Sequence, residues 1–233
     1  MMSREEVYAQ TLYKAYQERK VIEPFELDMV TAKKVYNIFS SMLAQSEGFG
    51  GYKISLTTEE TLKKFGSTEP LYGLLTKPMI GDDTEFELWF NNHLAEVEII
   101  LNTDHCTLDN YPSCVKESFL GVELPATRFN TWNIKAPQIQ ADDSAAGRLF
   151  LGVEISLPFN EEVEFYVNGN KVGKGRPRYV YGSLDDMVKW LIKKVGYVNG
   201  YVSTGVFVGP VNVKKGDKLR LKSESKEVEV KLI

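Results

Sequence analysis

The chain has 233 residues, with 28 Lys and Arg against 32 Asp and Glu and a formal net charge of -4. This length is enough to bury a substantial core, and the mild acidic excess offers no electrostatic footprint for nucleic acid. No stretch approaches the ~20 apolar residues that span a bilayer, and the polar start MMSREEVYAQTLYKAY lacks the apolar core of a signal peptide. We therefore expect a cytoplasmic protein that binds neither nucleic acid nor a membrane.

Residues 1–50 are predicted to be mainly helical. Between Glu5 and Arg19 the apolar residues recur at helical spacing, and a second pattern of this kind extends to Met42 from an expected N-cap at Thr31. The glycines of SEGFGGYK end this part of the chain.

Residues 51–233 favour β-structure. Short β-rich runs separated by turn signals include AEVEIIL, GRLFLGVEISL, EVEFYVNGNKVGKG and DKLRLKSESKEVEVKL. The dipeptide Asn168-Gly169 predicts a hairpin, and the apolar stripe within Leu184–Val195 predicts one later helix. Because no repeat or linker interrupts the chain, we expect a single domain over residues 1–233, with the helices first and the β-rich body after them.

Cysteine and histidine are scarce, which limits the available chemistry. The two cysteines, Cys106 and Cys114, are fewer than a disulfide framework or a cysteine zinc site usually uses, so we expect two free thiols. A serine- or cysteine-based triad needs a histidine beside its nucleophile, but the chain has only His93 and His105. Because His105 and Cys106 are adjacent on a predicted strand, their side chains face apart, and both histidines are expected to be structural or solvated.

Glu96 and Glu98 form the carboxylate pair best suited to a metal ion. In the strand-like run AEVEIIL, alternate residues point to one face, so both carboxylates would project together. Two like charges this close need a cation or a proton between them, and Mg²⁺ and Mn²⁺ favour oxygen ligands. The apolar flanks of this pair favour burial. The same E-x-E spacing recurs at Glu85/Glu87, Glu162/Glu164 and Glu227/Glu229. This spacing is also what any half-exposed strand shows, so it does not by itself indicate a metal site.

Lys53 and the run ADDSAAG are further candidates, and each has an ordinary alternative. Lys53 alternates with apolar neighbours in GYKISL, which also fits an exposed lysine on a strand. The polar residues Asp142, Asp143 and Ser144 precede a strong β run, and they also fit a helix cap or a turn.

Seven fragments in the same order resemble the fumarylacetoacetase superfamily, in particular its 2-oxopent-4-enoate (2-hydroxypentadienoate) hydratases and 4-oxalocrotonate decarboxylases. They are GYKISLTT, GSTEPLYGLL, AEVEIIL, LGVELPATRFNTW, QADDSAAGRLFLG, YGSLDDMVKWLIKKV and VGPVNVKKGDKL. The resemblance covers most of the chain. It implies an α+β fold in which N-terminal helices pack on a mixed, rolled β-sheet barrel, and a homo-oligomer that is a dimer or a ring of dimers.

The resemblance also implies the residues of a site. Lys53 matches the active-site lysine, which suits proton transfer if burial lowers its pKa. The implied ligands of one Mg²⁺ or Mn²⁺ are Glu96, Glu98 and Glu123. The implied substrate-binding residues are Tyr72, Asp142 and Ser144.

The implied activity is that of a lyase acting on a small 2-oxo or 2-hydroxydienoic acid. Chelation by the cation would stabilise an enolate, from which water addition gives hydration and loss of a distal carboxylate gives decarboxylation. A tautomerase of oxaloacetate-like compounds needs only the same chelation, and a catalytically weakened paralogue that serves as a binding or partner subunit is a third reading. The superfamily's carbon–carbon hydrolases use a His/Glu pair upstream of the metal strand, and no histidine lies between Asn37 and Lys53. This argues against hydrolysis of an acylpyruvate.

Three departures from the family pattern affect its proton-transfer groups. Leu71 stands where the family has an aspartate that can act as an acid or base, and Asp143 stands where it usually has asparagine. The segment 208–210 reads V-G-P in place of T-G-S, which implies a loss of hydroxyls near the site. We therefore expect an intact metal set and an unusual substrate.

Overall fold

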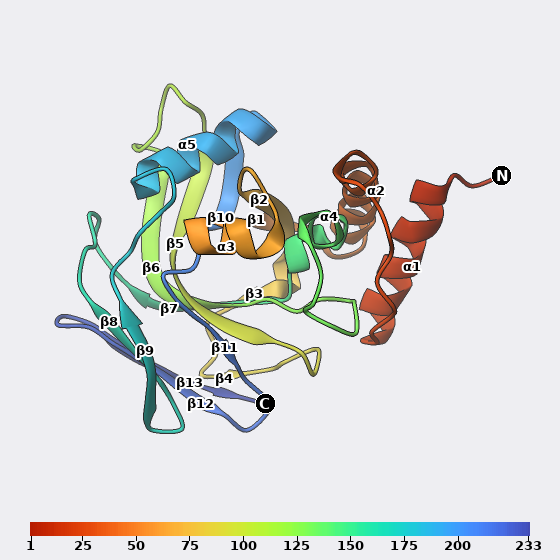
Figure 1. Cartoon of the computed structure of the whole chain (residues 1–233). Helices are drawn as coiled ribbons and strands as arrows, with labels where there is room; N and C mark the ends of the chain where they lie inside the picture. The colour runs from red at the N-terminus through yellow and green to blue at the C-terminus, as the bar shows by residue number, and fades with distance from the viewer.

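The computed structural model describes residues 1–233 and places a group of helices beside two curved β-sheets (Figure 1). The helices are α1 (Arg4–Glu18), α2 (Met29–Glu47), α3 (Glu59–Phe65), α4 (Ala136–Ala141) and α5 (Leu184–Val195), with short 3-10 turns η1 (Lys77–Met79) and η2 (Asp143–Ala145). None of the helices combines the length and apolar character needed to cross a membrane.

The strands make up most of the chain after residue 48. They are β1 (Phe49–Ser55), β2 (Leu71–Thr76), β3 (Ile80–Gly81), β4 (Glu85–Phe86), β5 (Leu94–Cys106), β6 (Val115–Leu124), β7 (Arg148–Glu154), β8 (Val163–Val167), β9 (Asn170–Gly175), β10 (Val198–Ser203), β11 (Val208–Asn212), β12 (Lys218–Lys222) and β13 (Glu227–Leu232).

The two N-terminal helices confirm the predicted helical part of the chain. Ser3 caps α1 with a capping box that includes Glu6. The cap of α2 is Asp28, whose side chain accepts from the backbone N–H of Thr31 at 2.8 Å, so the cap expected at Thr31 is wrong and the helix begins earlier. Both helices bury an apolar face, and their buried side chains share one cluster with residues of α4 and β2.

The larger sheet has eight strands and curls into a half-barrel. Its path is β2-β1-β10-β5-β6-β7-β3, with β11 paired to β5 beside β10. Pairing is mostly antiparallel, but β1 runs parallel to β10 and β3 runs parallel to β7. N-terminal helices beside a mixed, rolled sheet confirm the α+β class expected from the sequence.

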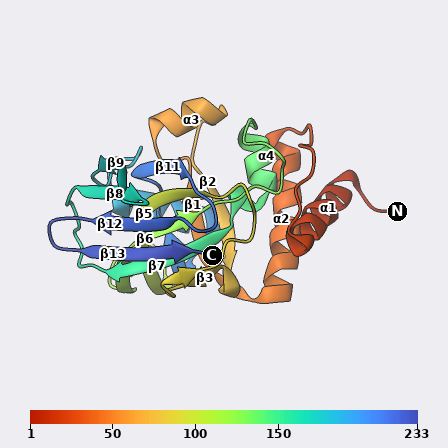
Figure 2. The ribbon, with the colours of Figure 1, turned by 90° about the horizontal axis from the view of Figure 1, so that it is seen from below.

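The smaller sheet has five strands in the order β4-β13-β12-β8-β9. The predicted hairpin joins β8 to β9, and Asn168 and Gly169 both have the positive φ, 51° and 81°, that a tight turn needs. In Figure 2 the helices α1, α2 and α4 lie together at one end of the molecule and this smaller sheet lies toward the other.

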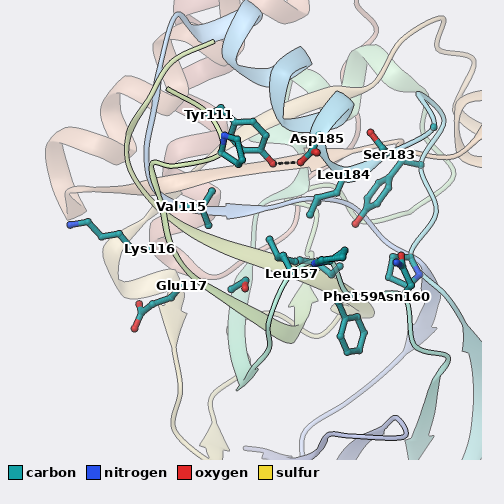
Figure 3. A pocket seen from close by; sticks show the side chains of 17 residues that line it. Tyr111, Val115, Lys116, Glu117, Leu157, Phe159, Asn160, Ser183, Leu184 and Asp185 are labelled. Atoms are coloured by element: carbon teal, nitrogen blue, oxygen red, sulfur yellow. Dashed lines mark hydrogen bonds between the residues drawn. The ribbon is translucent and has the colours of Figure 1, made fainter. Parts of the chain in front are cut away.

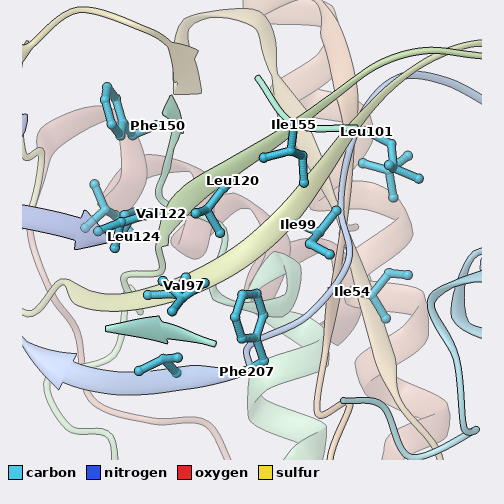
Figure 4. Close-up of a cluster of buried hydrophobic side chains, with 14 of the residues drawn as sticks. Ile54, Val97, Ile99, Leu101, Leu120, Val122, Leu124, Phe150, Ile155 and Phe207 are labelled. Atoms are coloured by element: carbon cyan, nitrogen blue, oxygen red, sulfur yellow. The ribbon is translucent and has the colours of Figure 1, made fainter. Parts of the chain in front are cut away.

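Alternation along β5 divides its side chains between two environments. The apolar residues Val97, Ile99 and Leu101 point into a core that includes side chains of the smaller sheet and of α5 (Figure 4). Ile100, on the opposite face, instead joins the cluster that contains side chains of α1 and α2. Glu96 and Glu98 alternate with these apolar residues and therefore face the same side as Ile100. Their carboxylates thus lie on the helix side of the larger sheet.

Cys106 and Cys114 form a disulfide, so the expectation of two free thiols is wrong. The bond joins the end of β5 to the turn before β6, across a loop whose Tyr111 hydroxyl donates to the Asp185 carboxylate of α5 at 2.7 Å. The two sulfurs meet because the hairpin brings their Cα atoms to 5.3 Å.

Candidate metal centre and active site

Three glutamates converge where β5 pairs with β6. Glu96 and Glu98 alternate along β5, and the antiparallel register places Glu123 of β6 directly opposite Glu96. One carboxylate oxygen from each residue lies within 4.8 Å of the others. The residue opposite Glu98 is Gly121, which adds no side chain to the centre of the cluster. The structure thus brings together all three predicted metal ligands.

Burial makes it unfavourable to keep all three carboxylates of this cluster ionised without a cation. Glu98 and Glu123 are each 1% exposed, and Glu96 is partly buried. Burial, together with the neighbouring Glu123 carboxylate, raises the pKa of Glu96 to about 7 and that of Glu98 well above its ordinary value. Glu123 keeps one carboxylate oxygen, Oε2, buried without a hydrogen-bond partner. Clustered carboxylates with an orphaned oxygen are the donor set that a hard divalent cation satisfies, so these residues fit the implied metal.

The segment that follows β10 holds Glu98 in place. The Ser203 hydroxyl and the backbone N–H of Gly205 both donate to Glu98 Oε2, and the Thr204 hydroxyl donates to the Ile99 carbonyl at 2.7 Å. The hydroxyls near the site thus come from Ser203 and Thr204, whereas Gly209 and Pro210, which line the neighbouring cavity, have none. The signal that the sequence reading missed is the S-T-G run at the end of a strand, a few residues before Val208.

Lys53 lies beside the same carboxylates. Lys53 belongs to β1 and is 2% exposed, and its side-chain ammonium forms an ion pair with Glu123. Burial alone would lower the pKa of Lys53, but the Glu123 and Glu96 carboxylates outweigh it, so the pKa is raised above its ordinary value. In this arrangement of carboxylates, burial does not lower the pKa of Lys53, which is the condition under which a lysine suits proton transfer.

A cavity of about 310 Å³ opens above Lys53 and Glu96. The hydroxyls of Ser144 and Ser55 line it, and Ser144 donates to Ser55 at 2.8 Å. Apolar side chains, among them Leu56, also line it. The lining further includes three exposed charged residues, Glu60, Lys64 and Arg178.

Of the three predicted substrate-binding residues, only Ser144 lines this cavity. Tyr72 points to the opposite face of the larger sheet, where its ring packs edge to face against Tyr36, Tyr52 and Trp190. It pairs with Ile54, the neighbour of Lys53, so strand alternation turns it away from the glutamates. The geometry thus does not support contact between Tyr72 and a substrate in this cavity.

Asp142 supports the site from behind instead of lining it. It is fully buried and forms an ion pair with Arg128, which also donates to the carbonyl oxygens of Asp142 and Ala146. Asp142 also accepts hydrogen bonds from the Thr127 hydroxyl and the Arg128 backbone N–H. This network encloses the turn that presents Ser144 to the cavity. Arg128, in TRFNTW, is the supporting residue that the sequence reading missed.

The turn itself has an uncommon backbone. Asp143, Ser144 and Ala145 have consecutive positive φ values of 51°, 52° and 54°, a conformation that costs energy in residues with side chains. The backbone N–H of Leu74 donates to Asp143 Oδ1 at 2.7 Å, which ties the turn to β2. Leu71, at the position of the family's aspartate, is buried in the apolar cluster on the helix side of the sheet.

Both histidines lie outside the site. His93 is buried, its ring bonds the Leu124 carbonyl and the Trp89 N–H, and burial lowers its pKa to about 4. His105 is exposed, and its ring packs at a tilt against the Tyr197 ring. The expectation that both are structural or solvated is confirmed.

A larger groove of about 600 Å³ lies elsewhere on the protein (Figure 3). Its walls come from the disulfide-linked loop, the segment before β8 and the start of α5, and the Tyr111–Asp185 hydrogen bond lies at its edge. The cluster of three glutamates is not part of its lining. Converging acidic groups, a buried lysine and a cavity occur together only above Glu96, which makes that cavity the candidate site.

Comparison with known proteins gives one sequence relative and several structural ones. The chain is 24% identical over 216 residues to a 2-hydroxyhexa-2,4-dienoate hydratase of Comamonas testosteroni, covering 82% of this chain and 80% of the relative. No protein-family model matches the chain.

Among solved structures, 4-oxalocrotonate decarboxylase from Pseudomonas putida G7, complexed with magnesium and adipate, is similar with a TM-score of 0.87 and 19% identity. The match covers 100% of this chain and 99% of the decarboxylase. A fumarylpyruvate hydrolase from Pseudomonas aeruginosa, in complex with Mn²⁺ and pyruvate, is similar with a TM-score of 0.54 and 15% identity over 78% of this chain and 88% of the hydrolase. The chain therefore has the fold seen in these solved structures, which is of the fumarylacetoacetase type.

Proposed function

We propose that this protein is a divalent-metal-dependent lyase, a hydratase or decarboxylase, that acts on a small 2-oxo or 2-hydroxydienoic acid. The observation that carries the proposal is the convergence of Glu96, Glu98 and Glu123 beside buried Lys53, next to a cavity that Lys53 and Glu96 line. The names of its relatives, a dienoate hydratase and an oxalocrotonate decarboxylase, support the same substrate class.

Each residue has a defined role in this proposal. Glu96, Glu98 and Glu123 hold Mg²⁺ or Mn²⁺ through carboxylate oxygens, and Ser203 and the Gly205 N–H fix the orientation of Glu98. The bound cation supplies Lewis-acid polarisation of the 2-oxo acid.

The remaining side chains handle the substrate's protons and exclude water. The Lys53 ammonium lies next to the carboxylates, and from this position Nζ can donate a proton to a substrate oxygen or carbon. The Ser144 hydroxyl, fixed against Ser55, offers a hydrogen bond that orients the substrate, and the apolar wall around Leu56 keeps bulk water away.

The first test is calorimetry on metal-stripped protein, with Mn²⁺ and Mg²⁺ titrated in the presence and absence of oxalate. Oxalate mimics the two adjacent oxygens of a 2-oxo acid enolate, and we expect it to bind only when metal is present. Binding of metal and oxalate would open a screen of hydratase, decarboxylase and tautomerase assays. If neither binds, the protein has kept the fold without the chemistry, which is the paralogue alternative that the loss of an aspartate at Leu71 favours.

Glu98→Gln is expected to abolish metal binding with the fold retained, because it replaces a charged ligand by a neutral group of the same shape. Calorimetry measures the first effect and circular dichroism the second. Glu85→Gln is the matched control, since Glu85 belongs to an E-x-E pair but is exposed on β4. Unchanged metal affinity in the Glu98 variant would refute the ligand assignment.

Lys53→Met is expected to lower turnover by about 100-fold, the usual size of a general acid–base contribution, while metal binding remains. Steady-state kinetics on the substrate found in the screen, with metal affinity as the second readout, measures this. A variant as active as the parent would make Lys53 merely a structural partner of Glu123.

We also propose a homo-oligomer, a dimer or a ring of dimers, on the strength of the family resemblance. Light scattering on the purified protein measures its mass.

The cytoplasmic location stays a prediction, and the Cys106–Cys114 disulfide argues for a compartment that is not strongly reducing. Thiol alkylation of the protein in intact cells distinguishes the bonded form from the reduced form.

A further inference from the structure

The segment between β9 and α5, residues 176–183, is tied by hydrogen bonds to two other connections of the larger sheet. The backbone N–H of Val180 donates to the carbonyl oxygen of Thr57 at 2.7 Å. One residue earlier, the Tyr179 hydroxyl lies 3.3 Å from the hydroxyl of Thr204. The segment is therefore held both to the chain that follows β1 and to the chain that follows β10.

The partners of Thr204 set the direction of its hydrogen bond with Tyr179. A hydroxyl has one hydrogen to donate, and the Thr204 hydroxyl donates its own to the Ile99 carbonyl at 2.7 Å. The Tyr179 hydroxyl must therefore donate, and the Thr204 oxygen accepts. Because hydrogen bonds in such a chain polarise one another, the phenol strengthens the bond that fixes Thr204 to the backbone of β5.

Both hydrogen bonds lie next to Gly205, whose backbone N–H donates to Glu98 Oε2 at 3.1 Å. Thr204 directly precedes Gly205 in the chain. Thr57 packs against Gly205 so closely that a Cβ built there would lie 2.3 Å from the Thr57 Oγ1, and the φ of Gly205 is 119°. The direction in which the Gly205 N–H points therefore depends on the positions of both threonines.

We infer that Tyr179 is a positioning residue for the metal ligand Glu98 and acts through its hydrogen bond to Thr204. The inference rests on the proposed function, because it assumes that Glu98 binds the cation. Tyr179 does not line the candidate cavity, and its side chain lines the larger groove instead. It therefore orients a ligand without touching the substrate, as the outer partners of metal ligands do.

The test is Tyr179→Phe, which removes the hydroxyl and keeps the ring. Calorimetry of Mn²⁺ binding to metal-stripped protein is expected to show about tenfold weaker affinity, the lower end of the usual cost of losing an outer partner of a metal ligand. The electron paramagnetic resonance spectrum of the Mn²⁺-saturated variant should also differ from that of the parent, because Glu98 is less firmly oriented. A residue that only supports the fold would leave this spectrum unchanged.

Variants of Thr204 test whether Tyr179 acts through this one contact. Thr204→Val removes the acceptor and should weaken Mn²⁺ binding at least as much as Tyr179→Phe does. Adding Tyr179→Phe to Thr204→Val should cause no further loss, because side chains that act through a shared contact are not additive. Thr204→Ser keeps the hydroxyl and should restore the affinity of the parent.

Tyr111→Phe is the matched control. Tyr111 lines the same groove and also donates a hydrogen bond from its hydroxyl, but its acceptor is Asp185 of α5. This variant should bind Mn²⁺ as tightly as the parent and give the same spectrum.

Failure of this inference and failure of the proposed function give different results. If the parent binds Mn²⁺ but Tyr179→Phe binds it equally well, or if the losses in the double variant add, the inference is wrong and the proposed function stands. If the parent does not bind Mn²⁺, the proposed function falls and this inference falls with it.

Discussion

At the scale of single residues, Asp143 shows most clearly how a departure from the family pattern is accommodated. Its carboxyl is fully buried, with Oδ1 hydrogen-bonded to the Leu74 N–H and Oδ2 without a partner. Burial raises the pKa of Asp143 to about 8 from an ordinary value of 3.8. At neutral pH the carboxyl is therefore mainly protonated, and it resembles in shape and charge the asparagine that the family usually has.

Asp143→Asn is expected to stabilise the protein at alkaline pH and to change little at acidic pH. Because the folded pKa lies above the unfolded one, the protonated carboxyl's contribution is complete below about pH 4 and is lost as pH rises toward 8. The asparagine cannot ionise, so the variant should gain about 5 kcal/mol over the parent at pH 8. Urea unfolding of both proteins at pH 5 and pH 8, with chelator present, measures the difference. An equal gap at the two pH values would show that Asp143 is not neutral in the fold.

At the scale of elements, the approach of β2 to the Asp143–Ala145 turn decides whether Ser144 reaches the cavity. Gly73 of β2 pairs with Lys53, and a Cβ built on Gly73 would lie 2.3 Å from the Asp143 carbonyl oxygen. Only a residue without a side chain permits this contact between two backbones. Gly73 thereby lets β2, the neighbour of the Lys53 strand, pack directly against the turn that presents Ser144 to the cavity.

Gly73→Ala is expected to destabilise the protein by about 1–3 kcal/mol and to weaken oxalate binding, because the added methyl group pushes the turn away. Gly81→Ala is the control, since its Cβ would meet only the tip of the Phe86 ring at 3.1 Å. Urea unfolding and calorimetry measure the two effects. If Gly73→Ala behaved as the control does, the close packing of β2 against the turn would not matter for the site.

Two features of the β5–β6 hairpin hold the glutamate cluster in place. One is the strand register, and the other is the Cys106–Cys114 disulfide. Reduction of Cys106–Cys114 is expected to lower the free energy of unfolding by about 2–3 kcal/mol, because the open loop gains conformational entropy in the unfolded chain. Unfolding with and without reductant measures this, and a double Cys→Ser variant should show no response to reductant. Equal stability of the oxidised and reduced protein would contradict it.

At the scale of the whole molecule, the larger sheet separates two apolar cores, and the glutamate cluster lies on its helix side. One core includes the smaller sheet and α5, and the other includes α1 and α2. The cluster joins β5 and β6, which lie near the middle of the sheet's strand order. A metal that relieves the repulsion among these carboxylates therefore stabilises the element that both cores pack against.

Mg²⁺ or Mn²⁺ at about 100 times its dissociation constant is expected to stabilise the folded protein by ~2.7 kcal/mol, which corresponds to a rise in Tm of about 5–10 °C for a chain of this size. Glu98→Gln should show no rise. Thermal unfolding followed by circular dichroism at increasing metal concentration measures both. An equal rise in parent and variant would mean that the cation binds elsewhere.

The sequence by itself determined the features that depend on neighbouring residues. Helical periodicity predicted α1, α2 and α5, Asn168-Gly169 predicted its hairpin, and strand alternation put Glu96 and Glu98 on one face. Glu123 came only from the family resemblance, because no spacing rule reveals which residue a partner strand places opposite Glu96.

Tertiary structure alone decided the features that depend on how distant segments meet. Strand register turned Tyr72 away from the cavity, hairpin geometry joined Cys106 to Cys114, and the fold brought Glu60 to Arg178 across 118 residues of chain. Local patterns report which face of an element a side chain occupies. Which elements then meet is set by the burial of apolar surface over the whole chain, since long-range pairing is favoured only when the complete core forms.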